Sequence, residues 1–168
     1  MKWFERTFEF NLPALMFPNV VERLRGTPAR VEDLTNKLNK NILIQPDGDA
    51  WSIQEHVGHL LDLEPLWRGR IDDYVSGKER LRDADLTNTK TNSANHNEDE
   101  LGNILADFRH KRGRMIHQLD ALDLAATSLS AIHPRLEQPM RLLDLIFFIA
   151  EHDDHHLATI SRLNIELG

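Results

Sequence analysis

The hydrophobic positions of this chain follow the 3.6-residue period of an amphipathic helix over four long stretches. The pattern predicts helices from Leu12 to Gly26, from Trp51 to Val75, from Leu101 to Leu119 and from Met140 to about Leu163. No segment of the sequence shows the apolar and polar alternation that is typical of half-buried strands. We therefore expect an all-α protein, an antiparallel four-helix bundle of the up-down kind with one or two long connections.

The first predicted helix has a well-marked end. Gly26 is a helix stop signal, and Thr27 followed by Pro28 fits a new helix, with threonine as the cap and proline at the first helical position. Apolar residues at helical spacing then continue to Leu38. The bundle is therefore expected to carry a short extra helix between its first two long ones.

Local signals also mark the later boundaries. Ser52 is expected to cap the helix that follows Trp51, and Pro65 is expected to kink it. Residues 77–97 are polar and rich in threonine, asparagine and aspartate, which predicts a long loop, and loops of this length are often functional. Asn97 and Glu100 resemble a capping box for the next helix.

Composition and charge narrow the class of protein. The chain has 168 residues, of which 40% are hydrophobic and 28% charged, and this fits a single helical domain over residues 1–168. A net charge of −7 disfavours binding to nucleic acid or to a membrane surface. The absence of cysteine excludes disulfides, cysteine-ligated metals and a cysteine nucleophile. Charged residues interrupt the N-terminus before an apolar signal segment could form, so we expect a cytoplasmic protein.

Histidines stand out in this composition, with nine in the chain. His152 and His156 are one helical turn apart, on the inward-facing apolar side of the last predicted helix. Two imidazoles at this spacing can ligate one metal ion. The alternative is that each is a core histidine hydrogen-bonded to a carbonyl group. His155 falls on the polar strip of the same helix, where we expect contact with solvent or a salt bridge.

A third ligand would complete a catalytic type of metal site, with coordination positions open for water or substrate. The second long helix offers His56 and His59. Periodicity does not decide between them, although His56 lies nearer the centre of the apolar stripe and is slightly favoured by it.

Other polar residues are weaker candidates. Glu64 falls within the apolar stripe of the second long helix, where an unpaired carboxylate is costly, so it is a candidate for orienting a metal-bound imidazole or for accepting a proton. Alternatively, the kink at Pro65 turns Glu64 outwards, or Arg68 pairs with it. The basic run 108–114 is a candidate for binding a phosphate or carboxylate, and the loop residue His96 for closing over the site, but both are more typical of a solvated surface.

Three segments carry a resemblance to a known family. The most informative are Trp51-Ser52-Ile53-Gln54-Glu55-His56-Val57-Gly58-His59-Leu60 and Glu151-His152-Asp153-Asp154-His155-His156-Leu157, and residues 23–30 resemble an opening found in one branch. The chain thus resembles the DinB/YfiT-like superfamily of four-helix-bundle metalloproteins over roughly Val20 to Leu163. The most specific part is the Trp-Ser start with a histidine eight positions on.

The resemblance implies a set of metal ligands. In that family the ligands are a histidine at this position of the second helix and both histidines of a His-x-x-x-His on the last helix. Carried over to this chain, they are His59, His152 and His156, which overrules the slight preference for His56. The His-Arg-Gly-Gln run that often closes the motif elsewhere is replaced here by His-Leu-Ala-Thr at residues 156–159. The implied cofactor is a divalent ion such as Zn, Ni, Fe, Mn or Co.

The resemblance also implies a function. Characterised relatives include thiol-dependent S-transferases, so the leading hypothesis is a metal-dependent transferase that joins a low-molecular-weight thiol, supplied by a cosubstrate, to a small-molecule substrate. One alternative is a hydrolase that uses metal-bound water with Glu64 or a nearby carboxylate as proton shuttle. The other is a non-catalytic bundle that binds metal or a small molecule, or that only dimerises. Relatives are often dimers, which suggests a homodimer.

Overall fold

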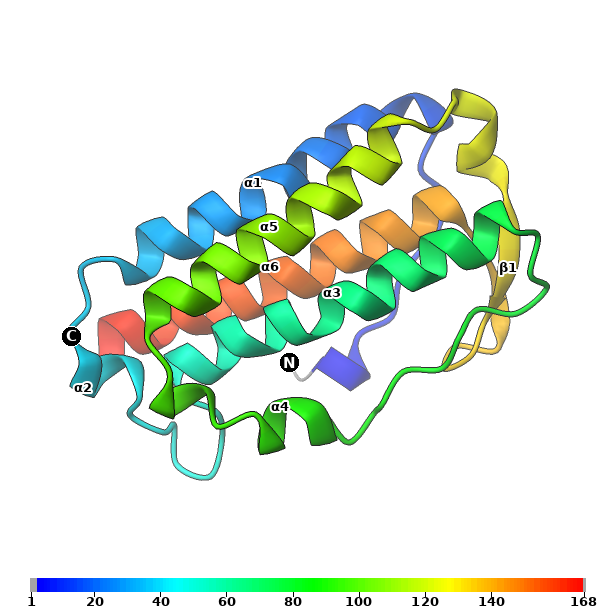
Figure 1. Cartoon of the computed structure of the whole chain (residues 1–168). Coiled ribbons are helices and arrows are strands. Elements are labelled where there is room, and N and C mark those ends of the chain that lie inside the picture. The colour runs from blue at the N-terminus through cyan, green and yellow to red at the C-terminus, as the bar shows by residue number, and fades with distance from the viewer. Residues whose placement is uncertain (1–2, 168) are drawn as a thin grey trace.

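The computed structural model describes residues 3–167 and shows four long helices packed side by side (Figure 1). These helices are α1 (Phe17–Thr35), α3 (Ile53–Val75), α5 (Leu101–Asp120) and α6 (Leu142–Leu167). Helix α1 packs against α5 and α6, and α3 packs against the same two helices. The four-helix bundle predicted from the hydrophobic pattern is confirmed.

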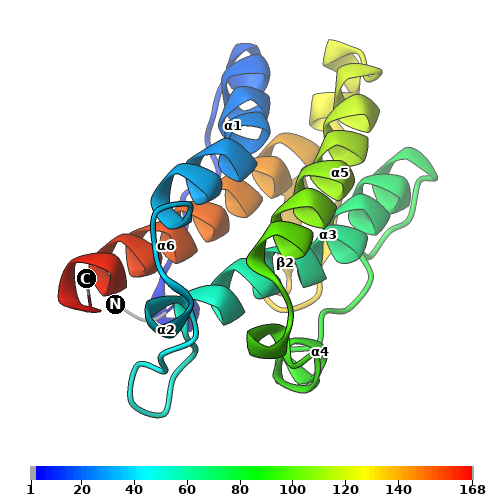
Figure 2. The same cartoon turned by 60° about the vertical axis from the view of Figure 1, so that its left-hand side comes forward.

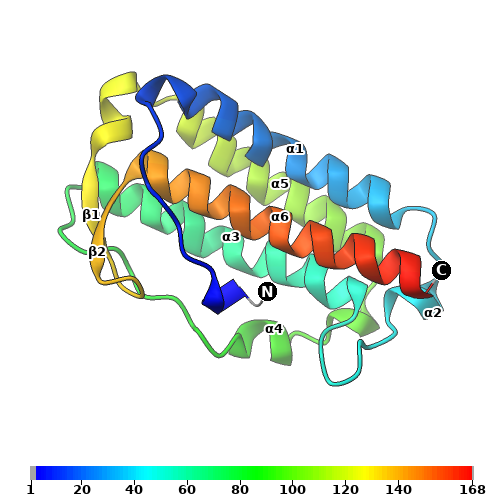
Figure 3. The same cartoon turned by 180° about the vertical axis from the view of Figure 1, so that it is seen from behind.

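The direction of the helices follows from one long connection. Helices α1 and α6 run one way and α3 and α5 run the other way, as the colours in Figures 1 and 3 show. Residues 76–100 return along the bundle to the end at which α3 begins. There Ser52, before α3, donates a hydrogen bond of 2.7 Å to the side chain of Asn97, before α5. Helices α3 and α5 are therefore parallel neighbours, which the sequence pattern had not indicated.

Helix α1 runs through Gly26, Thr27 and Pro28 without a break, so the predicted stop at Gly26 and the separate helix after it are wrong. A proline inside a helix has no N–H to donate to the carbonyl group four residues earlier. Here that carbonyl belongs to Leu24, and it accepts a hydrogen bond of 3.0 Å from Arg112 Nη1 on α5. A distant side chain thus replaces the missing donor.

Shorter elements complete the connections. Helices α2 (Lys40–Leu43) and α4 (Thr89–Ser93) pack against α3 on the side seen in Figure 2. Ser52 caps α3 as predicted, in a capping box with Glu55, and α3 continues through Pro65 to Val75. Helix α5 begins at Leu101, and its cap residue is Glu100 without a side-chain hydrogen bond, so the capping box predicted for Asn97 is wrong.

A small β-hairpin precedes the last helix. The hydrophobic pattern predicts no strand in this segment. Strand β1 (Ser130–His133) pairs antiparallel with β2 (Gln138–Arg141). Helix α6 therefore begins at Leu142 rather than at Met140. Strands of four residues are too short to stand out against the helical periodicity around them.

A buried polar layer divides the core into two apolar clusters. Each long helix contributes a buried polar residue between the members of the two clusters: Thr27 on α1, Glu64 on α3, Arg112 on α5 and Asp153 on α6, where His152 and His156 lie in the same interval. Arg112 donates to Glu64 Oε1 and to Asp153 Oδ2, each at 2.6 Å, and Thr27 donates to Asp153 at 2.8 Å. Burial acts to lower the pKa of Arg112, but the two carboxylates outweigh it and raise the pKa above its ordinary value.

Replacing Arg112 with methionine is expected to lower the free energy of unfolding by about 3–5 kcal/mol, because two buried carboxylates lose their partner charge. Urea unfolding monitored by circular dichroism measures the loss. The matched control is Arg114→Met, an exposed position on the same helix, with an expected change within about 0.5 kcal/mol. Equal losses in the two variants would show that the polar layer does not stabilise the bundle.

Candidate metal centre

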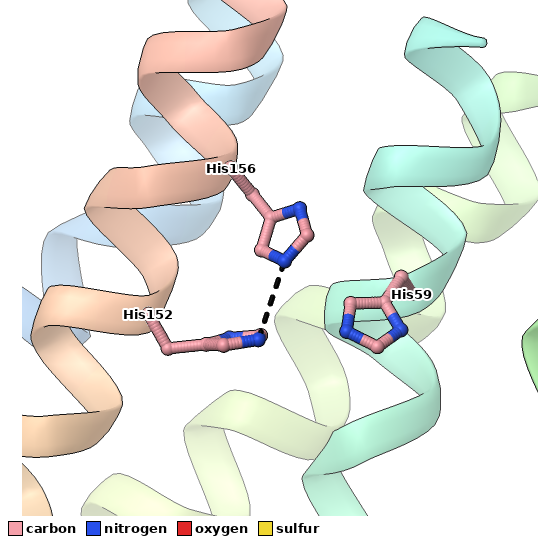
Figure 4. Close-up of side chains that lie close together, drawn as sticks. All are labelled: His59, His152 and His156. Carbon is pink, nitrogen blue, oxygen red and sulfur yellow. Dashed lines mark hydrogen bonds between the residues drawn. The ribbon is translucent and has the colours of Figure 1, made fainter. Parts of the chain in front are cut away.

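Three buried histidines meet between α3 and α6. His59 lies on α3, His152 and His156 lie on α6, and one ring nitrogen of each lies within 4.8 Å of the others. The Nε2 atoms of His152 and His156 are 3.2 Å apart, with the ring of His59 opposite them (Figure 4). The structure thus brings together the three residues that the family resemblance indicated. We call them the histidine triad.

A hydrogen-bond chain orients the ring of His59. Its Nδ1 is 3.1 Å from the Thr91 hydroxyl, and that hydroxyl donates its only proton to Asp62 Oδ2, also at 3.1 Å. The hydroxyl oxygen therefore accepts the proton of Nδ1. Nε2 of His59 is left with its lone pair free, and a ring nitrogen faces the other two histidines in Figure 4.

His56 contacts the triad from outside. Its Nδ1 lies 2.8 Å from Nδ1 of His156. When His156 donates the proton of this bond, its own Nε2 carries the lone pair that faces His152. The residue that periodicity slightly favoured as a ligand thus lies where it would orient a ligand.

Burial keeps these imidazoles neutral. It lowers the pKa of His59 to about 4, with repulsion from His56 contributing, and it lowers the pKa of His56 to about 4 as well. The pKa values of His152 and His156 also lie well below the ordinary value, through burial first and the neighbouring histidines second. Neutral imidazole is the form that binds a metal ion, so the triad is suited to ligation at neutral pH.

The donor set fits a divalent metal ion. Two nitrogens bound to a tetrahedral ion at about 2.0–2.1 Å lie roughly 3.3 Å from each other. The Nε2 atoms of His152 and His156 are separated by 3.2 Å. Neutral imidazoles whose lone pairs converge on one point repel each other unless a proton or a cation lies between them, and a bound ion removes this repulsion.

The polar connection between α3 and α5 supports the triad. His96 is buried, contrary to the solvated position expected for it, and its Nε2 lies 2.8 Å from Asp62 Oδ2. The ring occupies space that Gly58 leaves open, since a Cβ at position 58 would come within 2.2 Å of it. His96 therefore holds the carboxylate that accepts the proton of Thr91.

Glu64 does not reach the triad. Its Oε1 accepts two hydrogen bonds from Arg112, of 2.9 and 2.6 Å. Glu64 also does not line the cavity of about 310 Å³ that opens beside the triad. Burial raises the pKa of Glu64, and Arg112 opposes this shift. The partner of Glu64 is thus Arg112 rather than Arg68, and this position gives no support to a proton-shuttle role.

Sequence reasoning missed the role of Arg112. The basic run 108–114 was expected to be a solvated face, but Arg112 is among the most completely buried side chains. A signal was present, because Arg112 lies four residues after Phe108 and three before Met115, within the apolar stripe of the helix. An arginine at such a position indicates a buried carboxylate partner.

A cavity of about 310 Å³ opens beside the triad. Its apolar wall is formed by Trp3, Phe4, Trp51, Leu63, Leu66, Trp67 and Phe148. The ring of Trp3 packs edge-on against His152 with centroids 4.9 Å apart, and Trp51 packs against His59 at 4.6 Å. His155 is half-buried and also lines the cavity, so it is closer to the site than its polar strip suggested.

The fold and the triad together define a class of protein, a four-helix bundle with a candidate three-histidine metal centre facing a cavity. The family model of the DinB superfamily matches residues 23–160. The chain therefore belongs to the DinB superfamily.

Comparison with solved structures supports the fold. The chain is similar to YfiT from Bacillus subtilis, described as a probable metal-dependent hydrolase with an unusual four-helix bundle topology. The TM-score is 0.86 at 18% sequence identity, over 97% of this chain and 94% of that one. No curated protein matches the chain. Within residues 3–167, no helix has the length and apolar character needed to cross a membrane.

The metal-free protein is expected to lose stability as the pH falls from about 6.5 to about 4, the ordinary and the folded-state pKa of His59. In this window the unfolded chain binds protons that the folded chain does not, so acid favours unfolding, by about 1.4 kcal/mol per pH unit for each such histidine. Chemical denaturation at a series of pH values measures the slope. The slope should decrease in His59→Gln and stay unchanged in His117→Gln, an exposed control. An equal slope in wild type and His59→Gln would show that His59 is not held neutral.

Proposed function

We propose that this protein is a metal-dependent enzyme whose divalent ion is held by His59, His152 and His156. The observation that carries the proposal is the convergence of three buried imidazoles at the wall of a cavity of about 310 Å³. Structural zinc sites are closed by four protein ligands, whereas three ligands and an open face are typical of catalytic sites. Three imidazoles suit Zn, Ni, Fe, Mn or Co.

We propose thiol transfer as the reaction, in which the thiol of a low-molecular-weight cosubstrate attacks an electrophilic small molecule. A metal ion at the triad would lower the pKa of a coordinated thiol and polarise the substrate. The chain itself contains no cysteine, so the thiol comes from outside. Glu64, the carboxylate considered as a proton acceptor, is engaged by Arg112. Thiol transfer does not require such a base, because a coordinated thiol loses its proton on binding.

Hydrolysis by metal-activated water is the second candidate. The description of YfiT as a probable metal-dependent hydrolase favours it. His56 and His155 line the cavity outside the triad. A neutral imidazole in such a position could accept the proton of an attacking water.

Tag-free protein is expected to bind about one equivalent of divalent metal after incubation with Zn, Ni, Mn or Fe(II), as measured by elemental analysis. The variants His59→Ala, His152→Ala and His156→Ala should each lose it, because two nitrogens hold an ion much less tightly than three. The control His155→Ala removes an imidazole from the same cavity and should retain the metal, whereas His56→Ala, which removes the hydrogen-bond partner of His156, should weaken binding by about 10–100-fold without abolishing it. A wild type that stays metal-free would overturn the proposal.

Turnover of electrophilic substrates is expected only when a low-molecular-weight thiol is present, and a free-thiol assay should show that one thiol is consumed per product. The variant His152→Ala should abolish this consumption. Product formation without any thiol would instead indicate hydrolysis. In that case His155→Ala should reduce the rate by about 10²–10⁴-fold if His155 is the base.

A further inference from the structure

Two arginines that line the same cavity each carry an unused hydrogen-bond donor. Arg70 on α3 is 1% exposed, and Arg135, in the turn of the hairpin, is half-buried. The Nη2 atom of each is buried and has no hydrogen-bond partner among the described residues. Burying a charged group with an unused donor costs free energy unless a ligand accepts a hydrogen bond from that donor and balances the charge.

Arg70 is positioned by neutral groups. Its Nε donates to the carbonyl oxygen of Arg82 at 3.1 Å, and its Nη1 donates to Nε2 of His133 at 3.0 Å. Burial, with Arg70 contributing, lowers the pKa of His133 to about 3, so the imidazole is neutral and accepts this bond. Neither partner supplies a negative charge to balance the guanidinium.

Arg135 lines the same cavity from the turn of the hairpin. Its guanidinium packs against the rings of Phe4 and Phe148, with centroids at 5.4 and 5.6 Å, which positions the cation without neutralising it. Burial lowers the pKa of Arg70 to about 10, Asp73 and Asp83 act in the opposite direction, and Arg135 contributes a smaller repulsion. At neutral pH Arg70 remains charged.

The acidic residues of the cavity form no ion pair with Arg70 or Arg135, although the charge of Asp83 raises the pKa of Arg70. Asp83 and Asp85 line the cavity, and both are exposed. The carboxylate of Asp85 accepts hydrogen bonds from the backbone N–H groups of Thr87 and Thr89. Among the ion pairs formed by residues 3–167, none includes Arg70 or Arg135.

The arginines and the triad are joined by an apolar wall. His59 and Arg70 are 11 residues apart on α3, which is about three turns, so they share one side of the helix at a separation of about 16 Å along its axis. Leu63, Leu66 and Trp67 line the cavity between these positions. A small molecule with an apolar body and one charged end fits this arrangement.

We propose that Arg70 and Arg135 form a subsite for the carboxylate group of the substrate, which makes the substrate an amphipathic carboxylic acid. A carboxylate carries one negative charge on two oxygens that accept hydrogen bonds, and both arginines of the cavity lining have a positive charge and an Nη2 donor without a partner. The orientation of the substrate in the cavity, with its reacting group toward the triad, rests on the proposed function. The assignment of the two arginines as an anion subsite does not depend on that function.

Calorimetry with 3-phenylpropionate and its neutral amide tests the subsite. Metal-free protein is used first, because a carboxylate can also coordinate a metal ion, and zinc-loaded protein is measured in parallel. We expect the acid to bind about tenfold or more tightly than the amide, and Arg70→Gln and Arg135→Gln each to remove that preference. Thermal shifts with acetate and benzoate, each against its amide, extend the test to smaller carboxylates.

Arg80→Gln is the matched control. Arg80 is exposed, does not line the cavity, and bonds to Glu137 and to the carbonyl oxygen of Pro134 in the hairpin that carries Arg135. Its replacement removes one positive charge near the cavity and leaves Arg70 and Arg135 in place, so the affinity should not change. If Arg70→Gln does not fold, the half-buried Arg135→Gln decides the test.

The proposal is overturned if no carboxylate of the set binds better than its amide, or if the preference survives in Arg135→Gln. Binding that requires zinc and is unaffected by both substitutions would place the carboxylate on the metal and would overturn the proposal as well. Inorganic phosphate is tested alongside, and arginine-dependent binding of phosphate alone would assign the subsite to a phosphate ester instead. Absence of metal in the elemental analysis would refute the proposed enzyme but leave arginine-dependent binding intact, so the two failures are distinguishable.

Discussion

The guanidinium of Arg112 is the contact on which the arrangement of the bundle depends. It donates to Glu64 on α3, to Asp153 on α6 and to the carbonyl of Leu24 on α1, while its own backbone belongs to α5. One side chain therefore bonds to the three other long helices. Apolar side chains tolerate small shifts between helices, but charged hydrogen bonds have a narrow geometry, and breaking one leaves a buried charge. The layer thus favours one register of the four helices.

That register determines where the histidines meet. Asp153 directly follows His152, and Glu64 lies five residues after His59, so Arg112 joins the two helices that carry the triad. A slip of α3 by one turn would move His59 by about 5.4 Å. This exceeds the 4.8 Å within which the three ring nitrogens lie. The network that completes the core therefore also assembles the candidate metal site.

The sequence predicted those features of the fold that have local causes. The helix cap at Ser52 and the stripe of α5 involve residues a few positions apart, and both are confirmed. Pro28 and Asn97 were misread because distant partners decide their role. Arg112 replaces the donor that Pro28 lacks, and Asn97 accepts from Ser52 instead of capping α5. The direction of α5 likewise depends on the path of a loop, which hydrophobic periodicity does not describe.

The candidate site also depends on contacts between distant residues, which hydrophobic periodicity does not identify. Helical spacing alone paired His152 with His156, but it could not separate His59 from His56, since both line the cavity. What separates them is the hydrogen-bond partner of each Nδ1 atom, which is the Thr91 hydroxyl for His59 and the ligand candidate His156 for His56. Periodicity indicates which face of a helix a residue occupies, whereas a ligand binds the atoms that remain unpaired after the fold has satisfied the others. Such atoms, including the buried nitrogens of two arginines in the same cavity, are identified only from the three-dimensional arrangement.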